Sequence, residues 1–153
     1  MPKKVTTSIS ILLLLGLGII AWFAINNYIP REAPVPIVKY NNVTIPTVKS
    51  MNNWLDKENG GNSNLTLPPE ESTKDLTAIA VKLNSNIIIS FDTKNQPKQM
   101  EIIHWTQGEI ETRVILNNEI FRTSTVPGIY VYEIIGRWDD THDSAHSFRI
   151  EVK

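Results

Sequence analysis

The chain has 153 residues, a formal net charge of −1 and no cysteine. The missing cysteine excludes disulfides, thiolate catalysis, cysteine-ligated zinc and a lipid-modified cysteine as an anchor. The lysines and arginines are scattered along the chain, which excludes the basic patch of a nucleic-acid-binding protein.

One long apolar run, residues 9–25, follows Lys3 and Lys4. As a helix it is about 26 Å long, and its neutral flanks extend it toward the ~30 Å of a bilayer core. We therefore expect a transmembrane anchor at residues 9–29. By the positive-inside rule the two lysines place residues 1–8 in the cytoplasm, so the protein crosses the cell membrane once and the remainder is extracytoplasmic.

Two other interpretations of this run remain open. A signal peptide has a shorter apolar region of about 7–15 residues and an A-x-A-like cleavage site. Ala21 and Ala24 are three positions apart, with bulky Trp22 and Phe23 between them, which favours a retained anchor over cleavage and secretion. A buried helix of a soluble protein is a third interpretation, but no later segment has the pattern needed to cover it.

A dense group of prolines, Pro30, Pro34 and Pro36, follows the apolar run and predicts a stiff stalk at residues 30–36. We expect one extracytoplasmic domain at residues 37–153, in which residues 35–54 form straps or an added sheet edge. Residues 50–74 are rich in Asn, Gly and Pro, and predict a long loop.

From residue 75 onward, short β-rich segments alternate with turns. Asn117-Asn118 lies between two such segments and predicts a two-residue hairpin. Seven strands at this spacing, with no helix pattern after residue 30, predict an all-β fold, an immunoglobulin-like antiparallel β-sandwich. The expected strands are 77–83, 87–91, 100–106, 109–116, 119–124, 129–138 and 147–152.

The strongest local signal for this fold is the segment from Val126 to Tyr132. It has a Pro-Gly turn followed by alternating tyrosines, which opens the penultimate strand of many immunoglobulin-like domains. We expect the hydroxyl of Tyr130 to bond back to the preceding corner. Tyr132 and Trp138 should share its face of the strand, so all three residues are predicted to be structural.

Two segments resemble a loose group of small, uncharacterised, membrane- or lipid-anchored extracytoplasmic proteins of Bacillus-type bacteria. One is Pro46-Thr47-Val48 leading to Trp54; the other ends in Trp138 and the alternating Phe148–Val152. In that group the Trp follows a Pro-x-x-Gly-x-Tyr-x-Tyr pattern. Here Pro127 directly precedes Gly128, so the spacing between Pro and Gly differs. The resemblance implies an anchored immunoglobulin-like domain and assigns no activity or site. The absence of cysteine also favours a bacterial envelope.

Trp54 and Leu55 interrupt the polar segment 50–74 and have two interpretations. They either hold the long loop onto the sandwich or present an exposed Trp to a partner, since Trp is enriched at binding hot spots. In the second case the partner surface lies near Trp54 and the 56–74 loop.

The densest group of potential metal ligands lies between the last two expected strands: Asp139, Asp140, His142, Asp143 and His146. Such residues bind divalent ions when they converge, and a metal-dependent envelope hydrolase using a 139–146 loop is the alternative function. A solvated hairpin tip is the interpretation we favour. Residues 56–64 match a calcium-binding loop poorly, because Glu58 and Gly60 occupy ligand positions.

Further catalytic patterns are weak. His104 lacks a nucleophile motif around it, and Glu109 and Glu111 are expected on a solvated strand face. The sequence therefore predicts no enzyme and no cofactor. It predicts a membrane-anchored, non-catalytic binding or interaction domain, with an envelope protein or the cell wall as partner; it indicates neither the ligand nor the oligomeric state.

Overall fold

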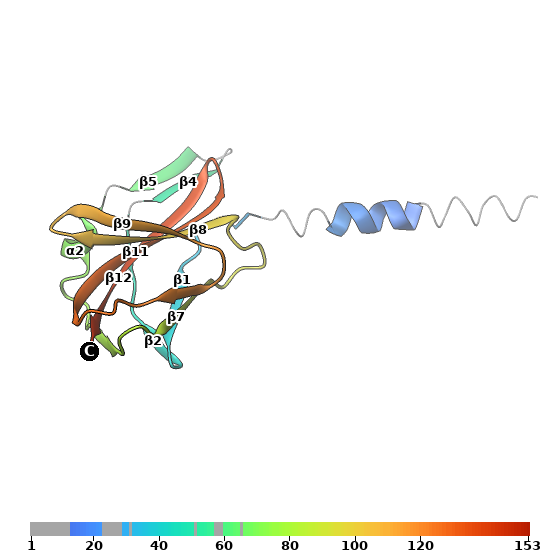
Figure 1. Cartoon of the computed structure of the whole chain (residues 1–153). Helices are drawn as coiled ribbons and strands as arrows, with labels where there is room; N and C mark the ends of the chain where they lie inside the picture. Colours follow the sequence, from blue (N-terminus) through green and yellow to red (C-terminus); the bar gives the residue numbers. More distant parts are fainter. Residues whose placement is uncertain (1–12, 23–28, 31, 51, 57–59, 65) are drawn as a thin grey trace, which may run out of the picture.

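The structure is a computed structural model that describes residues 13–22, 29–30, 32–50, 52–56, 60–64 and 66–153. In this part of the chain the strands form two sheets that lie face to face (Figure 1). The small sheet has the order β10-β7-β1-β2. These strands are β1 (Pro36–Tyr40), β2 (Val43–Ile45), β7 (Asn86–Phe91) and β10 (Ile120–Arg122).

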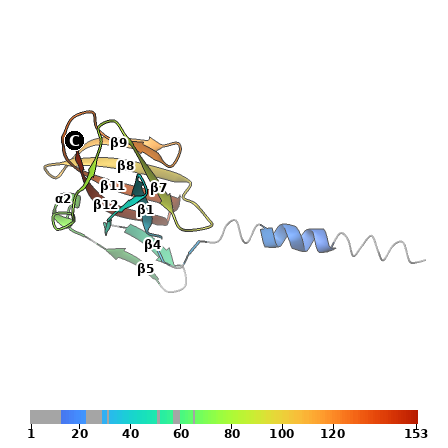
Figure 2. The ribbon, with the colours of Figure 1, turned by 90° about the horizontal axis from the view of Figure 1, so that it is seen from below.

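The large sheet has the order β5-β4-β12-β11-β8-β9, with β3 and β6 also paired to β12. Its longest strands, β11 and β12, form a hairpin at the centre, and the described pairs are antiparallel except that of β6 with β12. Its members are β3 (Val48–Lys49), β4 (Asn52–Asp56), β5 (Gly60–Asn64), β6 (Ile79–Val81), β8 (Gln99–Thr106), β9 (Glu109–Leu116), β11 (Gly128–Asp139) and β12 (His142–Val152). Figure 2 shows β1 and β7 lying against one face of this sheet.

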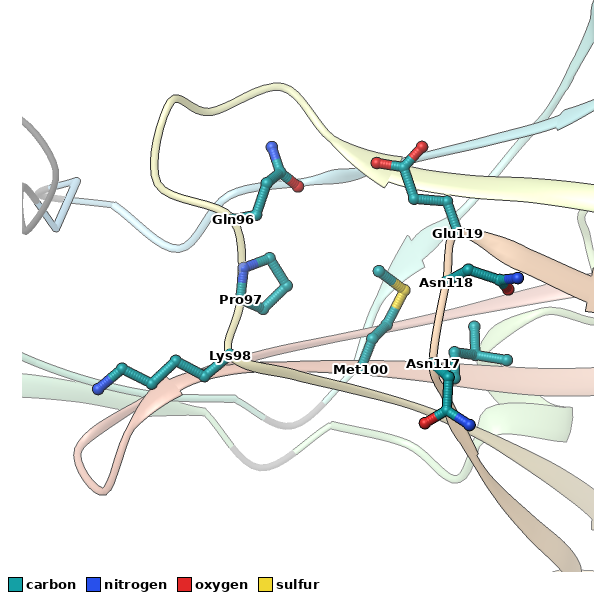
Figure 3. Close-up of a pocket in the computed structure, with 8 residues that line it drawn as sticks. Gln96, Pro97, Lys98, Met100, Asn117, Asn118 and Glu119 are labelled. Carbon is teal, nitrogen blue, oxygen red and sulfur yellow. The ribbon is translucent and has the colours of Figure 1, made fainter.

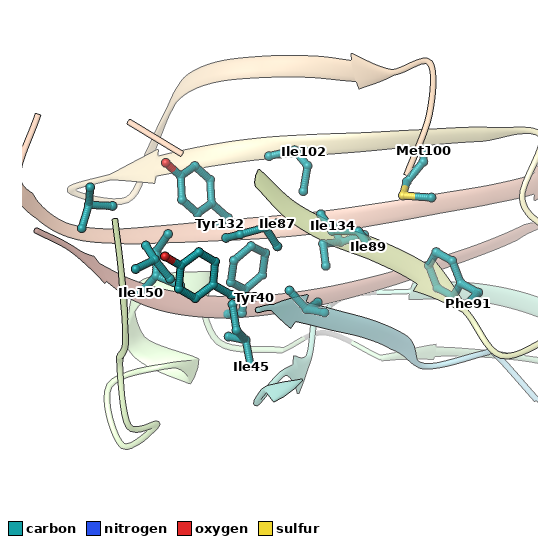
Figure 4. Packing of buried hydrophobic residues seen from close by; sticks show 14 of the residues in the cluster. Tyr40, Ile45, Ile87, Ile89, Phe91, Met100, Ile102, Tyr132, Ile134 and Ile150 are labelled. Carbon is teal, nitrogen blue, oxygen red and sulfur yellow. The ribbon is translucent and has the colours of Figure 1, made fainter. Parts of the chain in front are cut away.

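The core lies between the two sheets and is built by alternation along their strands. Ile87, Ile89 and Phe91 of β7 are buried, whereas Ile88 between them is 49% exposed, because successive strand residues point to opposite faces. From the large sheet, β8, β11 and β12 contribute alternate residues in the same way, and Figure 4 shows both sets meeting between the ribbons. The predicted all-β sandwich is therefore confirmed.

The segment 35–54 has a larger role than the predicted straps or added edge. β1 lies inside the small sheet, between β7 and β2. Val38 of β1 and Ile45 of β2 are fully buried in the core. β2 lies at the edge of the small sheet, as expected of an added edge, whereas β1 is paired on both sides; Pro36 lies at the start of β1 and Pro46 just after β2.

The predicted hairpin at Asn117-Asn118 is wrong. β9 pairs with β8 in the large sheet, and β10 pairs with β7 in the small sheet. The two asparagines therefore carry the chain from one sheet to the other. A local turn signal indicates that the chain reverses direction, but it does not determine which sheet the next strand joins.

The segment 50–74, predicted to be a long loop, contains β4, β5 and the short helix α2 (Pro69–Ser72). The Glu70 carboxylate accepts hydrogen bonds from the backbone amides of Gln107 and Gly108 at the end of β8. Thr73 is fully buried. These contacts hold α2 against the large sheet. The polar composition of the segment did not indicate that Glu70 would bond to the sheet or that Thr73 would be buried.

The described part of the predicted stalk packs on the domain. The Trp54 indole nitrogen donates a 3.0 Å hydrogen bond to the carbonyl of Pro30, and the Ser144 hydroxyl donates a 2.6 Å bond to that of Pro34. Ala33 packs against the core. A proline-rich segment has few amide donors, but its carbonyls still accept hydrogen bonds, which is how this segment is held.

Near the N-terminus, residues 13–22 are helical. No helix within the described residues is both long enough and apolar enough to span a membrane. The predicted tail at residues 1–8, and much of the predicted anchor at residues 9–29, lie outside the described residues.

Candidate binding site

A cavity of about 200 Å³ lies at one end of the sandwich, where the segment from β7 to β8 meets the crossover from β9 to β10 (Figure 3). Its volume is below the ~300–1,000 Å³ of typical drug-sized ligand sites. It therefore suits a ligand the size of a single side chain. The cavity is lined by Gln96, Pro97, Lys98, Met100, Leu116, Asn117, Asn118 and Glu119.

The floor of the cavity is apolar. Met100 and Leu116 lie directly opposite each other in the pairing of β8 with β9. Met100 is buried in the core and Leu116 packs against it, so the floor is an extension of the sandwich interior. Pro97 adds apolar surface beside them.

The wall formed by residues 92–98 is held by hydrogen bonds to fixed groups. The Trp138 indole nitrogen donates a 2.6 Å bond to the carbonyl of Asn95. The side-chain nitrogen of Gln96 donates to the carbonyls of Phe91 and Thr93, at 2.8 and 2.6 Å. Because these bonds do not involve a ligand, this wall is formed in advance of binding.

The opposite wall is anchored through its backbone. The Glu119 carbonyl accepts a 2.7 Å bond from the amide of Ile89, and the Asn118 side-chain oxygen accepts from the amide of Ile120. The Glu119 carboxylate and the Asn117 amide group make no hydrogen bond or ion pair with any described residue. These two groups are therefore available to a ligand.

Sequence reasoning missed this site. Its residues come from the segment between the expected strands 87–91 and 100–106, from the ends of expected strands, and from the predicted hairpin turn at Asn117-Asn118. Nothing in these segments indicates that they meet, because their contact depends on how β8 pairs with β9 and on which sheet β10 joins.

Trp54 and Leu55, the predicted binding residues, differ in their exposure. Trp54 is only 5% exposed. Its ring packs edge-on against Trp138 and His142, with centroid distances of 5.2 and 4.9 Å. Leu55 is 37% exposed, beside this buried indole. The Trp54 ring is thus packed onto the sandwich, as in the first of the two interpretations of the sequence.

The predicted 139–146 loop is a tight hairpin, because β12 already begins at His142. The side chain of Asp139 caps its turn, accepting bonds of 2.8 and 2.9 Å from the amide and hydroxyl of Thr141 and lying 2.8 Å from Nδ1 of His142. Burial acts to raise the pKa of Asp139, but the bonds from Thr141 and His142 outweigh it and lower this pKa to about 2. Asp140 lies in the turn itself.

The other potential metal ligands of this segment are separated along β12. Residues four apart on a strand are roughly 13 Å apart, so His142 and His146 do not converge as they would on a helix. Asp143 accepts a 2.7 Å bond from the amide of Asn53. Burial, with a smaller effect of Lys49, lowers the pKa of His146 to about 4. Among the described residues, no group of three or more His, Asp or Glu side chains is placed to hold a metal ion.

His104 is engaged within the sandwich. Its Nδ1 lies 2.9 Å from the Glu111 carboxylate, and its ring packs against those of Tyr130 and Tyr132. Glu111 is the extra residue of a bulge in β9, which removes it from the regular alternation with Glu109. The two glutamates therefore do not form the paired strand face that the sequence predicted.

The outer face of the large sheet holds two buried carboxylates that the sequence did not reveal, Glu101 and Glu133. Glu101 accepts a 2.9 Å bond from Arg137 and a 2.6 Å bond from Gln99. Glu133 accepts a 3.2 Å bond from the Trp105 indole, and burial raises its pKa. Both groups are bonded to neighbouring strands, so they serve the fold.

No model of a known protein family matches this chain, and neither does any curated protein.

Proposed function

We propose that this chain is a non-catalytic binding domain, held on the outer face of a cell membrane, whose ligand binds in the cavity between residues 96–98 and 117–119. The observation that carries this proposal is the preformed cavity, which combines an apolar floor with rim groups that the fold does not use. An apolar pocket with a few unpaired polar groups is the usual form of a ligand site.

The surroundings of the titratable groups support a non-catalytic role. A general base needs access to a substrate within hydrogen-bond reach. His104 and His142 instead contact acidic side chains of the fold, and His146 is buried. No histidine lines the cavity.

The exposed side chains of residues 13–22 support the membrane anchor. The large aliphatic side chains there are 60–69% exposed to solvent, which is unfavourable unless another apolar medium covers them. Together with Lys3 and Lys4 at the N-terminal side, they favour a lipid-embedded helix with the domain outside. These side chains are Leu13, Leu14, Leu15, Leu17, Ile19 and Ile20.

The corner at Tyr130 supports an immunoglobulin-like sandwich. Its hydroxyl donates a 2.9 Å bond to the Val126 carbonyl and lies 2.8 Å from the Ser124 hydroxyl. This is the bond that the sequence predicted for the turn before the penultimate strand. The resemblance to anchored Bacillus-type proteins supports the same fold and location, with an envelope protein or the cell wall as partner.

A capture experiment tests the binding proposal. The tagged full-length protein should retain a specific component from an extract of the cell envelope. The variant Asn117→Trp should lose this component, because the large ring blocks the cavity mouth without removing any hydrogen bond of the fold. Asn86→Trp, at an exposed strand start away from the cavity, is the matched control and should capture normally. Equal capture by both variants would contradict a site at this cavity.

The absence of cysteine makes the membrane topology directly testable. A single cysteine introduced as Asn86→Cys should react with a membrane-impermeant maleimide in intact cells. A cysteine introduced as Thr6→Cys should react only after the cells are permeabilised. The reverse pattern would contradict the proposed orientation.

A further inference from the structure

We infer that the cavity binds an aliphatic primary ammonium, the side chain of a lysine presented by a partner polypeptide. This inference rests on the proposed function and specifies the chemistry of the same site.

The two polar groups that face each other across the cavity mouth, the Gln96 oxygen and the Glu119 carboxylate, are hydrogen-bond acceptors. The side-chain nitrogen of Gln96 is occupied by the carbonyls of Phe91 and Thr93, so only its oxygen remains for a ligand. An ionised glutamate such as Glu119 accepts hydrogen bonds and donates none. Figure 3 shows Gln96 and Glu119 on opposite sides of the cavity, with the oxygen of Gln96 directed toward Glu119. A ligand that binds between them must therefore donate.

The residues that line the cavity include one carboxylate, Glu119, and one ammonium, Lys98. The Glu119 carboxylate forms no ion pair with a described residue, and Figure 3 shows the side chain of Lys98 extending away from the cavity. The part of the chain after the N-terminal apolar run holds all 16 acidic residues and 13 of the 15 lysines and arginines, so it is slightly negative overall. A cation is thus complementary both to this carboxylate and to the domain that carries it.

The floor selects an aliphatic stem. Met100, Leu116 and Pro97 provide apolar surface without hydrogen-bonding side-chain groups. The flexible thioether of methionine adapts to a ligand of irregular shape. A lysine side chain buries four methylene groups along such a surface while its charge stays at the polar rim. The cavity volume of about 200 Å³ suits one side chain of this kind.

Lysine fits the mouth better than arginine does. The planar guanidinium matches a single carboxylate through two parallel hydrogen bonds. The ammonium group has three donors that diverge, so it can bond to acceptors that face each other, as the Glu119 carboxylate and the Gln96 oxygen do.

The methyl group of Met100 reports binding directly. The full-length protein, kept in neutral detergent, is labelled with ¹³C at its methionine methyl groups. The chain has three methionines, so three signals are expected, and Met100→Leu identifies the one from the cavity. The probes are the Nα-acetyl methylamides of lysine and of norleucine, which present the same apolar stem with and without the charge.

We expect the lysine probe to shift the Met100 signal with a dissociation constant on the order of 1–10 mM, as for a small fragment, and to leave the other two methionine signals unchanged. Norleucine should bind at least about fivefold more weakly, and Glu119→Gln should weaken the binding of lysine by a similar factor. Glu109→Gln, which removes the same charge at the far end of β9, is the matched control and should bind lysine normally.

Equal binding of the two probes, or no effect of Glu119→Gln, would overturn the lysine inference and leave the cavity as a binding site. If neither probe moves the Met100 signal, the lysine inference fails. If the Asn117→Trp variant also captures the envelope component normally, the proposed function fails with it.

Discussion

The indole nitrogen of Trp138 donates a 2.6 Å hydrogen bond to the carbonyl of Asn95, which joins the sandwich core to a wall of the cavity. Trp138 is almost fully buried and packs edge-on against Phe91 and Trp54. Residues of the core therefore position both this wall and the floor of the cavity, since Met100 in the floor also belongs to the core.

Replacing Trp138 with Phe should loosen this wall. The variant loses the bond to Asn95 and leaves space beside Phe91, so the free energy of unfolding should fall by about 2–3 kcal/mol. Urea denaturation measures this loss, and hydrogen exchange should show faster exchange of the backbone amides in residues 92–98. Unchanged exchange in that segment would contradict the role of this bond in fixing the wall.

Trp54 and Leu55, although adjacent, should respond very differently to alanine substitution. Trp54→Ala removes a buried ring that contacts Trp138 and His142, together with the bond to Pro30, and should cost roughly 3–5 kcal/mol of unfolding free energy. Leu55→Ala should cost under about 1 kcal/mol because this side chain is partly exposed. Thermal melting compares the two. A small effect of Trp54→Ala would restore it as a candidate binding residue.

The corner at Tyr130 should contribute about 1 kcal/mol to stability, the usual value of one hydrogen bond. Tyr130→Phe removes the bonds to Val126 and Ser124 while keeping the ring. Tyr132→Phe is the control, since its hydroxyl has no hydrogen-bond partner among the described residues. Chemical denaturation of both variants should show a larger loss for Tyr130→Phe, and the opposite order would contradict the corner.

His146 should make the domain less stable in mild acid. Its pKa is about 4 in the folded protein, against an ordinary value of 6.5, because burial disfavours the charged ring. Between these values the unfolded chain binds more protons. The stabilisation that comes from a neutral, buried His146 is thus fully present above pH 6.5. As the pH falls through 4, the free energy of unfolding should decrease by about 2–3 kcal/mol.

The variant His146→Gln isolates this effect. Burial also raises the pKa of Glu133, which lowers stability as the pH rises and so opposes His146 in part of the same range. Because Glu133 is present in both proteins, the difference in unfolding free energy between wild type and His146→Gln should shrink as the pH falls from 7 to 4. A difference that is constant with pH would refute the assignment.

The sequence predicted the fold well where alternation determined it. The period-two pattern of β7 and β11 and the Pro-Gly corner before Tyr130 each follow from local chemistry, and the structure has them. Pairing between distant segments was not predictable in this way. Asn117-Asn118 indicated a reversal, yet the partner of β10 is set by burial of Phe121 against Tyr132 across the sandwich.

The candidate site could be predicted even less, because it is formed by contacts between segments far apart in the sequence. Its floor requires Met100 to lie opposite Leu116, and its walls require two connecting segments to meet at one end of the sandwich. Conversely, the dense Asp and His residues of 139–146 are close in the sequence, but most of them lie on β12, where they do not converge. On a strand, their spacing separates His142 from His146.

The most direct test of the binding account is the Met100 methyl signal of the full-length protein, recorded with and without solubilised cell-envelope material. If the ligand binds in the cavity, the Met100 signal should shift while those of the other two methionines stay in place, and Asn117→Trp should abolish the shift. Envelope material that binds the protein without moving the Met100 signal would show that the ligand binds elsewhere, and would contradict a site in this cavity.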